Sequence, residues 1–309
     1  MTAAFARRSR GAVGLSLATI YLVWGSTYLG IRITDRTMPP LLMSSARFFL
    51  AGAALYALTA RGYRPTWREW RAAAIVGATL LGIGNAGVAW AETRLDSGLA
   101  ALIVAVIPLY VAVFDRLFFG RRLSAFAVLG LVVGFAGVAL LVRPGGSSHT
   151  GIALVLLGTT SAWAGGSLYA RGAPLPANPL VAAAMQMLCA SVLLGIAGAG
   201  SGELGDVHRQ AFGTEPLLAF GYLVLFGSIA AFSAYAWLLK NVRISVVATY
   251  AFVNPVVAVA LGALFLGEAI TGTTLAAGAA IVAAVILIVR ARPRPARSRV
   301  RARPATLTP

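Results

Sequence analysis

The residue types that carry covalent or metal chemistry are scarce in this sequence of 309 residues. Cysteine occurs once, at Cys189, and histidine occurs twice, at His149 and His208. A single cysteine can form neither an internal disulfide nor a cysteine-built metal site. We expect neither histidine inside a helix, and no acidic pair lies in the middle of an apolar run. Enzymes need a nucleophile with its base, a metal cluster or paired acids. We therefore expect no catalytic residue, no metal site and no cofactor.

The charged residue best placed to bind a ligand is Arg47, which lies inside an apolar run over residues 41–60. It sits about seven residues into that run, roughly 10 Å from the start of a helix. A charge at such a depth in lipid is costly unless it faces a cavity or a partner. Arg47 is therefore either a binding group for anions or a structural arginine paired with carbonyl groups or a carboxylate.

Aromatic and neutral polar residues in the middle of apolar runs form a second group of candidates. Trp24 and Trp163 lie near mid-depth, whereas tryptophan in membrane proteins usually lies at the interface. A small-molecule site needs an aromatic-lined cavity with a few hydrogen-bonding groups. Any one of these residues could instead pack between helices. The candidates for a central substrate cavity are Trp24, Ser26, Thr27, Tyr28, Arg47, Asn85, Trp163, Ser167, Gln186, Tyr235, Tyr250 and Asn254.

Pro108 and Pro255 each fall about eleven residues into an apolar run. Proline removes a backbone donor and frees a carbonyl group one turn earlier. Lipid tolerates such a break where neighbouring helices or a cavity satisfy the backbone. Two breaks at corresponding positions point to a binding site, and a packing kink is the alternative.

The composition indicates that these residues lie on membrane-spanning helices. Hydrophobic residues make up 59% and charged residues 11%, whereas soluble domains average about 25% charged residues. The 34 glycines suit close helix packing in lipid. A span needs about 20 apolar residues. The sequence predicts an all-α membrane bundle with ten spans, at about 12–31, 41–60, 72–91, 97–119, 124–142, 150–170, 179–199, 216–238, 244–266 and 273–290.

Basic residues between the spans predict the orientation, because cytoplasmic loops carry an excess of lysine and arginine. With the N-terminus inside, the inside segments hold 20 basic residues and the outside loops hold five. Both termini are then cytoplasmic, which an even number of spans requires. Residues 291–309 are rich in arginine and proline. We expect a disordered tail there that binds anionic lipids, and no nucleic-acid partner.

Two related halves follow a short N-terminal segment, residues 1–11. The first covers residues 12–145 and the second residues 146–290, with five spans in each. Because five is odd, the second half enters the membrane upside down, an architecture typical of secondary transporters. Offsets of 139 and then 147 residues align Trp24 with Trp163, Pro40 with Pro179, Arg47 with Gln186, Trp90 with Trp237, Pro108 with Pro255 and Gly120 with Gly267. Gln186 is neutral, and we expect it to bind a neighbouring helix.

Several short motifs make the chain resemble the EamA branch of the drug/metabolite transporter superfamily. They are Trp24-Gly25-Ser26-Thr27-Tyr28, Pro39-Pro40 before Arg47-Phe48, Gly84-Asn85, Ser161 to Ser167, Phe226-Gly227-Ser228, Asn254-Pro255 and Gly267-Glu268. The resemblance covers about residues 12–290. It implies ten helices in two inverted halves around a central cavity, and export of small metabolites or amino acids. The Gly-Glu pair of the family's first half reads Gly120-Arg121 here.

The leading hypothesis is therefore a secondary active exporter in the cell membrane, with a small molecule as substrate. A carrier of drugs, nucleotides or sugar-like metabolites, a channel and an intramembrane enzyme are the alternatives. A channel would show a filter segment, and ATP drive would need a phosphate loop; we find neither motif. Glu92 could couple transport to protons if it is partly buried. Alternatively, it is a solvated loop carboxylate near Arg94. Glu268 is expected to cap the short turn before the tenth span, where Thr271 and Thr273 can start the helix.

Overall fold

The computed structural model describes residues 2–120, 124–142, 149–208 and 213–290, and all regular elements within these ranges are helices. The tail predicted for residues 291–309 lies outside the described residues. Seven helices are long and apolar enough to cross a membrane. Three shorter apolar stretches, Val128–Gly137, Val253–Leu266 and Gly272–Ala284, complete the ten predicted spans.

Six spans are single helices within the described ranges. They are α1 (Thr2–Thr34), α2 (Pro40–Thr59), α7 (Ala125–Val142), α8 (His149–Gly172), α9 (Pro179–Gly200) and α14 (Gly272–Arg290). Helix α1 begins ten residues before the predicted span, because the first residues contain no proline to stop it. His149, expected outside the helices, is the first residue of α8.

Four spans are interrupted. The third consists of α3 (Trp67–Gly77), a π-helical segment (Ala78–Asn85) and α4 (Ala86–Glu92). The eighth has the same plan, with α10 (Thr214–Tyr222), a π-helical segment (Leu223–Ala230) and α11 (Ala231–Asn241). The fourth is α5 (Ser97–Val104) with α6 (Ile107–Phe119), and the ninth is α12 (Ile244–Val247) with α13 (Tyr250–Leu266). A short 3-10 turn, Glu203–Asp206, follows α9.

The corresponding helix ends have the same chemistry in both halves. Pro40 and Pro179 open α2 and α9, where a missing N–H costs nothing because the first turn has no intrahelical acceptor for it. Gly120 and Gly267 end α6 and α13 with positive φ angles of 65° and 67°. A residue with a side chain is strained in that left-handed conformation. Both aligned positions are therefore glycine because the backbone at each helix end has a positive φ angle.

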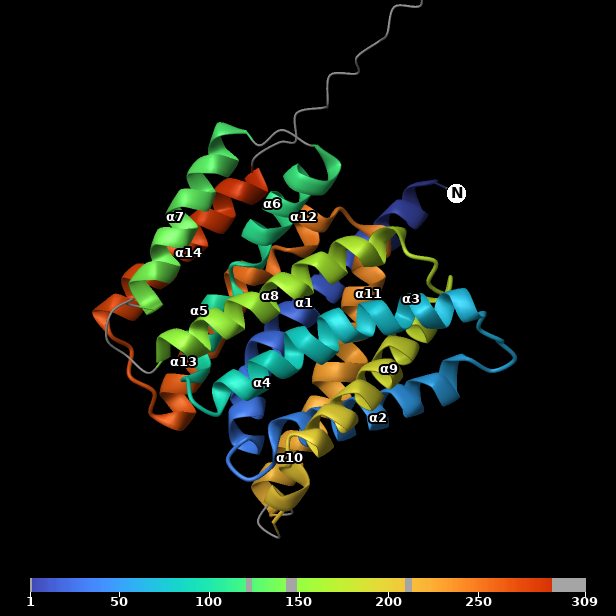
Figure 1. The fold of residues 1–309 in the computed structure, drawn as a ribbon. Helices are drawn as coiled ribbons and strands as arrows, with labels where there is room; N and C mark the ends of the chain where they lie inside the picture. The colour runs from blue at the N-terminus through green and yellow to red at the C-terminus, as the bar shows by residue number, and fades with distance from the viewer. Residues whose placement is uncertain (1, 121–123, 143–148, 209–212, 291–309) are drawn as a thin grey trace, which may run out of the picture.

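Helix packing is symmetric under exchange of the two halves (Figure 1). Helix α2 packs along α9 and α7 along α14, so each pairs with its own repeat mate. Helix α1 packs against α11 and α13, while α8 packs against the π-helical segment Ala78–Asn85 and α6. The first helix of each half therefore lies among the third and fourth spans of the other half, and the core of the bundle lies between the halves.

The sequence predicts matched helix breaks at Pro108 and Pro255, but the two spans break at different places relative to these prolines. The fourth span breaks just before Pro108, the second residue of α6. The ninth span breaks at Ala248 and Thr249, whereas Pro255 lies inside α13. The break of the second half therefore precedes its proline by about two helical turns.

Candidate functional site

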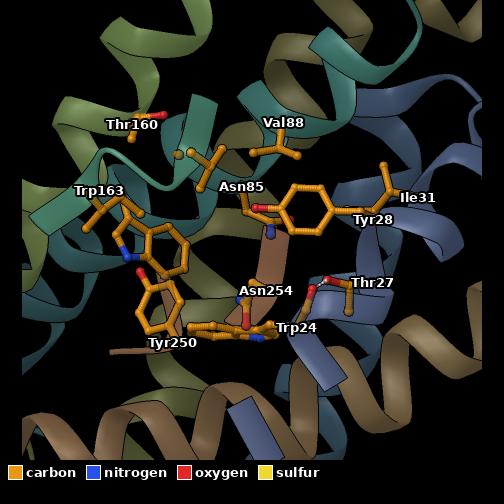
Figure 2. Close-up of a pocket in the computed structure, with 13 residues that line it drawn as sticks. Trp24, Thr27, Tyr28, Ile31, Asn85, Val88, Thr160, Trp163, Tyr250 and Asn254 are labelled. Atoms are coloured by element: carbon orange, nitrogen blue, oxygen red, sulfur yellow. Dashed lines mark hydrogen bonds between the residues drawn. The ribbon is translucent and has the colours of Figure 1, made fainter. Parts of the chain in front are cut away.

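A cavity lies at the centre of the bundle, between the two halves (Figure 2). Helix α1 supplies Trp24, Thr27, Tyr28 and Ile31, and α8 supplies Thr160 and Trp163. The cavity has a volume of about 50 Å³, whereas ligand pockets usually measure about 300–1,000 Å³. The free space at the site is therefore small. Its other lining residues are Gly84, Asn85, Val88, Val104, Ile107, Tyr250 and Asn254.

Aromatic rings form much of the cavity wall. The ring centroids of Trp24 and Trp163, which are repeat mates, lie 5.5 Å apart at an interplanar angle of 82°. Trp24 also meets Tyr250 edge to face at 5.4 Å. Its indole Nε1–H donates to the carbonyl of Gly227 at 3.2 Å. Edge-to-face pairs of this kind are favourable and hold the rings in fixed orientations. The cluster therefore gives the site a rigid apolar surface.

Two polar atoms on this wall lack partners. The indole Nε1 of Trp163 and the hydroxyl of Tyr250 are buried, and neither makes a hydrogen bond of standard geometry to a described residue, although the indole N–H lies near the hydroxyls of Tyr250 and Tyr235. The two groups lie next to each other at the cavity (Figure 2). Buried polar groups in proteins nearly always have a partner. A ligand oxygen or a water molecule in the cavity could accept hydrogen bonds from both.

Asn254 lies one helical turn after Tyr250 and is buried. Its amide faces the backbone carbonyls of Tyr250 and Tyr21, and the amide nitrogen donates to them at 3.2 and 3.1 Å when it is turned toward them. The amide oxygen then remains available as an acceptor. Since Trp163 and Tyr250 can donate, the site offers both kinds of hydrogen-bonding group.

Arg47 lies behind this cavity, and only 2% of the residue is exposed. Its Nε donates to Oγ of Ser228 at 2.8 Å, and Nη1 donates to Oδ1 of the cavity residue Asn85 at 3.4 Å. Both acceptors are neutral, and no carboxylate in the described part of the chain lies within salt-bridge distance. The guanidinium therefore stands next to the cavity with its charge uncompensated at close range.

Seven of the twelve cavity candidates from the sequence line the cavity: Trp24, Thr27, Tyr28, Asn85, Trp163, Tyr250 and Asn254. The other five lie outside its lining. Ser26 binds the Tyr222 hydroxyl at 2.5 Å, and Ser167 binds the Tyr235 hydroxyl at 2.7 Å. Gln186 lines a separate small void with Tyr235, and Arg47 reaches the cavity only through Asn85.

The sequence analysis missed several lining residues. Thr160 precedes Trp163 by one helical turn and therefore shares its face of α8, a signal that was present in the sequence. Ile31, Val88, Val104 and Ile107 also line the cavity, but nothing in a uniformly apolar run separates such residues from those that face lipid.

Glu92 is not a solvated residue. It is the last residue of α4 and is fully buried, and neither carboxylate oxygen has a partner among the described residues. Arg94, the neighbour expected from the sequence, instead stacks on Trp90, with its guanidinium carbon 4.9 Å from the ring centroid. The guanidinium of Arg32 donates to the backbone carbonyl of Glu92, not to its side chain.

The sequence matches the model of the EamA-like transporter family twice, over residues 12–143 and 149–290. The inner membrane transporter YedA of Escherichia coli strain K12 is 41% identical over 278 residues, which cover 88% of this chain and 89% of YedA. A protein of Streptantibioticus cattleyicolor, named a probable terminal-alkyne amino-acid exporter, is 26% identical over 89% of this chain and 92% of its own. A solved crystal structure shares the fold, with a TM-score of 0.67 and 22% identity over 90% of this chain and 97% of the other.

Proposed function

Because this chain belongs to the EamA-like transporter family and is a multi-pass membrane transporter, we propose that it is a secondary active exporter of small amino-acid-like solutes. The substrate binds in the central cavity, with an apolar side chain against the aromatic wall. Alternating access then opens the cavity to one face at a time. The chain carries no phosphate loop, so an ion gradient or substrate exchange supplies the driving force.

The observation that carries this proposal is the chemistry of the cavity lining. None of its thirteen residues, all within the described ranges, is charged. Rings of Trp24, Trp163 and Tyr250 supply apolar contact, and the unpaired donors of Trp163 and Tyr250 suit an oxygen acceptor. A solute with one apolar part and one carboxylate or carbonyl group satisfies both features. This combination describes an amino acid with an apolar side chain.

The charge of Arg47 supports the same class of substrate. An aromatic wall on its own would also attract an organic cation. A guanidinium without an ion-pair contact among the described residues repels a cation and attracts an anionic group, and Arg47 is linked to the cavity through Asn85. Zwitterionic and anionic solutes are therefore favoured over cationic drugs. The amino-acid exporter among the relatives supports this preference as well.

Nucleotides and sugar phosphates are the alternative substrates. Transfer of a phosphate into a cavity is usually paid for by several basic side chains or backbone N–H groups. The lining offers two tyrosine hydroxyls, two amides, two threonine hydroxyls and two indole N–H groups, of which the Trp24 N–H is already bound to a carbonyl. That set is too weak for a phosphate dianion, so we favour the amino-acid-like solute.

The proposed orientation of the chain in the membrane follows from the charge of the loops. The bias of 20 basic residues against five places both termini in the cytoplasm. The end of α1 then lies at the outer face, and the end of α8 at the inner face, because five spans separate them. The arginine-rich C-terminus then faces the anionic lipids of the inner leaflet.

Counterflow in liposomes tests the substrate class. Purified protein is reconstituted, the liposomes are loaded with unlabelled L-phenylalanine, and uptake of labelled L-phenylalanine is measured. We expect saturable exchange that unlabelled L-leucine inhibits and that phenethylamine, which lacks the carboxylate, does not inhibit. Saturable exchange of the organic cation tetraphenylphosphonium, without exchange of either amino acid, would overturn the proposed substrate class.

A further inference from the structure

Two buried carboxylates near the outer face lack partners. Glu92 ends α4, and Asp35 follows directly after α1. All four carboxylate oxygens are buried, and none has a hydrogen-bond partner among the described residues. Asp35 follows Arg32, which binds the Glu92 carbonyl, by three residues, and it lines one cavity with Thr93, the neighbour of Glu92 in the chain. The two carboxylates therefore lie in the same region, and the charge of Asp35 acts on Glu92. Two carboxyl groups in such a place do not readily ionise together, because like charges disfavour joint ionisation.

Asp35 connects this pair to the outer face. It lines a polar cavity of about 380 Å³ with Arg32, Arg36, Thr93, Asp96 and Glu268. Burial raises the pKa of the Asp35 carboxyl well above its usual range. The charge of Glu203 acts in the same direction, while Arg32 and Arg47 oppose the rise. Asp35 thus borders an outer polar cavity and favours the protonated state more than an exposed aspartate does.

Glu92 connects the pair to the substrate cavity. Arg32, which binds the Glu92 carbonyl, follows Tyr28 by one turn of α1, and Tyr28 lines the central cavity. The ring of Tyr28 reaches from α1 toward Asn85 (Figure 2). The order from outside to inside is therefore the outer polar cavity, Asp35, Glu92 and Tyr28 at the substrate site. A carboxylate at each step gives a proton a place to reside between the outer face and the centre.

We propose that Asp35 and Glu92 form the proton-coupling pair of this transporter, with Asp35 as the outer proton acceptor and Glu92 as the carrier beside the substrate site. This inference rests on the proposed function as an exporter. A proton from outside binds Asp35, the O–H bond breaks there as one forms at Glu92, and Glu92 releases the proton when the cavity opens inward. One proton enters for each substrate that leaves.

The other charged groups around the pair are accounted for. Around Glu92, these are Arg32 on α1, Asp35 and Glu268. Around Asp35, they are Arg32, Glu203 and Arg47, together with Arg36, Asp96, Asp206 and His208 in the two outer cavities that Asp35 lines. Glu203 and Glu268 accept hydrogen bonds from helix N-termini, so their carboxyl groups already have partners. Asp35 and Glu92 are the carboxyl groups with buried, unpartnered oxygens within the described ranges.

The pair has no counterpart in the second half. The alignment places Pro174 opposite Asp35 and Leu239 opposite Glu92. If a proton site is present at just one face, pH acts differently on the outward-open and inward-open states. Such an asymmetry is what a gradient-driven exporter needs, because uniform effects on both states would shift no equilibrium.

The test separates driven transport from exchange in liposomes that contain labelled L-phenylalanine. In the wild-type protein, an inward proton gradient should accelerate efflux several-fold over counterflow. Glu92→Gln and Asp35→Asn should lose this acceleration while counterflow continues, because exchange moves no net proton. Asp96→Asn alters an exposed carboxylate of the same outer cavity and should behave like the wild type. Unchanged acceleration in both Asp35→Asn and Glu92→Gln would overturn the pair.

A second measurement requires no substrate, so failure of the substrate class and failure of the pair are distinguishable. Infrared difference spectra of the reconstituted protein, recorded during a pH titration, should show bands of protonated carboxyl groups. Each single substitution should remove one band and shift the other, because the two groups interact. Spectra of both variants that equal the wild-type spectrum would refute the pair even if L-phenylalanine proves not to be a substrate. Size-exclusion profiles of the variants verify that they are folded.

Discussion

Arg32 and Arg171 occupy equivalent positions in the two halves, 139 residues apart, and each donates a hydrogen bond to a carbonyl at the end of the third span of its own half. Arg32 binds the carbonyl of Glu92, and Arg171 binds that of Leu239 at 3.3 Å. Glu92 and Leu239 are themselves equivalent, 147 residues apart. Because the halves are inverted, the two contacts lie at opposite faces. Both are formed in a structure whose central cavity has a volume of only about 50 Å³.

The paired arginine contacts predict opposite effects of two matched substitutions. In the proposed orientation, Arg32→Ala removes a contact at the outer face and should favour outward opening, whereas Arg171→Ala should favour inward opening. A single cysteine placed at Thr160 in a Cys189→Ser background reports access to the cavity. An impermeant thiol reagent applied from outside should label the Arg32→Ala protein several-fold faster and the Arg171→Ala protein more slowly. Equal labelling rates in the two variants would contradict a gating role.

Glu268 predicts a stability effect that crosses between the halves. Its carboxylate accepts hydrogen bonds from the backbone N–H groups of Ser97 at 2.8 Å and Gly98 at 3.1 Å, and from Oγ of Ser97 at 2.9 Å. It therefore caps α5 in the first half, and the expectation that it caps the short turn before α14 is wrong. Glu268→Ala should cost roughly 1–3 kcal/mol, because several charge-assisted hydrogen bonds are lost.

Thermal unfolding in detergent checks this cost. The melting temperature of Glu268→Ala should fall by several degrees relative to the wild type. Glu215→Ala is the matched control, because Glu215 is exposed in the first turn of α10. Equal melting temperatures for the two variants would show that the contact between Glu268 and α5 contributes little.

Asp35 predicts a pH dependence of stability. Its pKa is raised in the folded protein, mainly by burial, so the folded state holds this proton more tightly than the unfolded chain does. By linkage, stability is highest at a pH below the ordinary pKa of aspartate and falls as the pH rises toward the folded-state pKa. Asp35→Asn should remove this part of the pH dependence and raise the melting temperature at neutral pH. A melting temperature that Asp35→Asn lowers equally at acidic and neutral pH would contradict the assignment.

Much of the fold could be predicted from the sequence, because a lipid environment imposes strict length and polarity rules on each span. The ten spans and the inverted halves follow from those rules and from pairs such as Gly120 and Gly267. The break before α13 could not be predicted at its true position, because Pro255 lies inside the helix. The proline therefore does not mark where that span is interrupted.

The site could be predicted only at residues whose type is unusual in the middle of a membrane span. Trp24, Trp163 and Asn254 are out of place in lipid, and they line the cavity. Asp35 lies between two arginines in a short loop, a context typical of a solvated residue. Its burial arises from packing of distant segments. The partner of Glu268 lies 171 residues away in the chain, and local sequence carries no signal for such a contact.

The central claim is that the cavity between the halves binds substrate through the unpaired hydroxyl of Tyr250. Half-saturation of L-phenylalanine counterflow should therefore be measured for Tyr250→Phe and Tyr235→Phe. Both substitutions remove one buried hydroxyl and keep the ring, but the Tyr235 hydroxyl is already bound to Ser167. We predict that Tyr250→Phe raises the half-saturating concentration about tenfold, the value of one hydrogen bond, and that Tyr235→Phe leaves it within about twofold of the wild type. Equal half-saturation in Tyr250→Phe and the wild type would contradict the account.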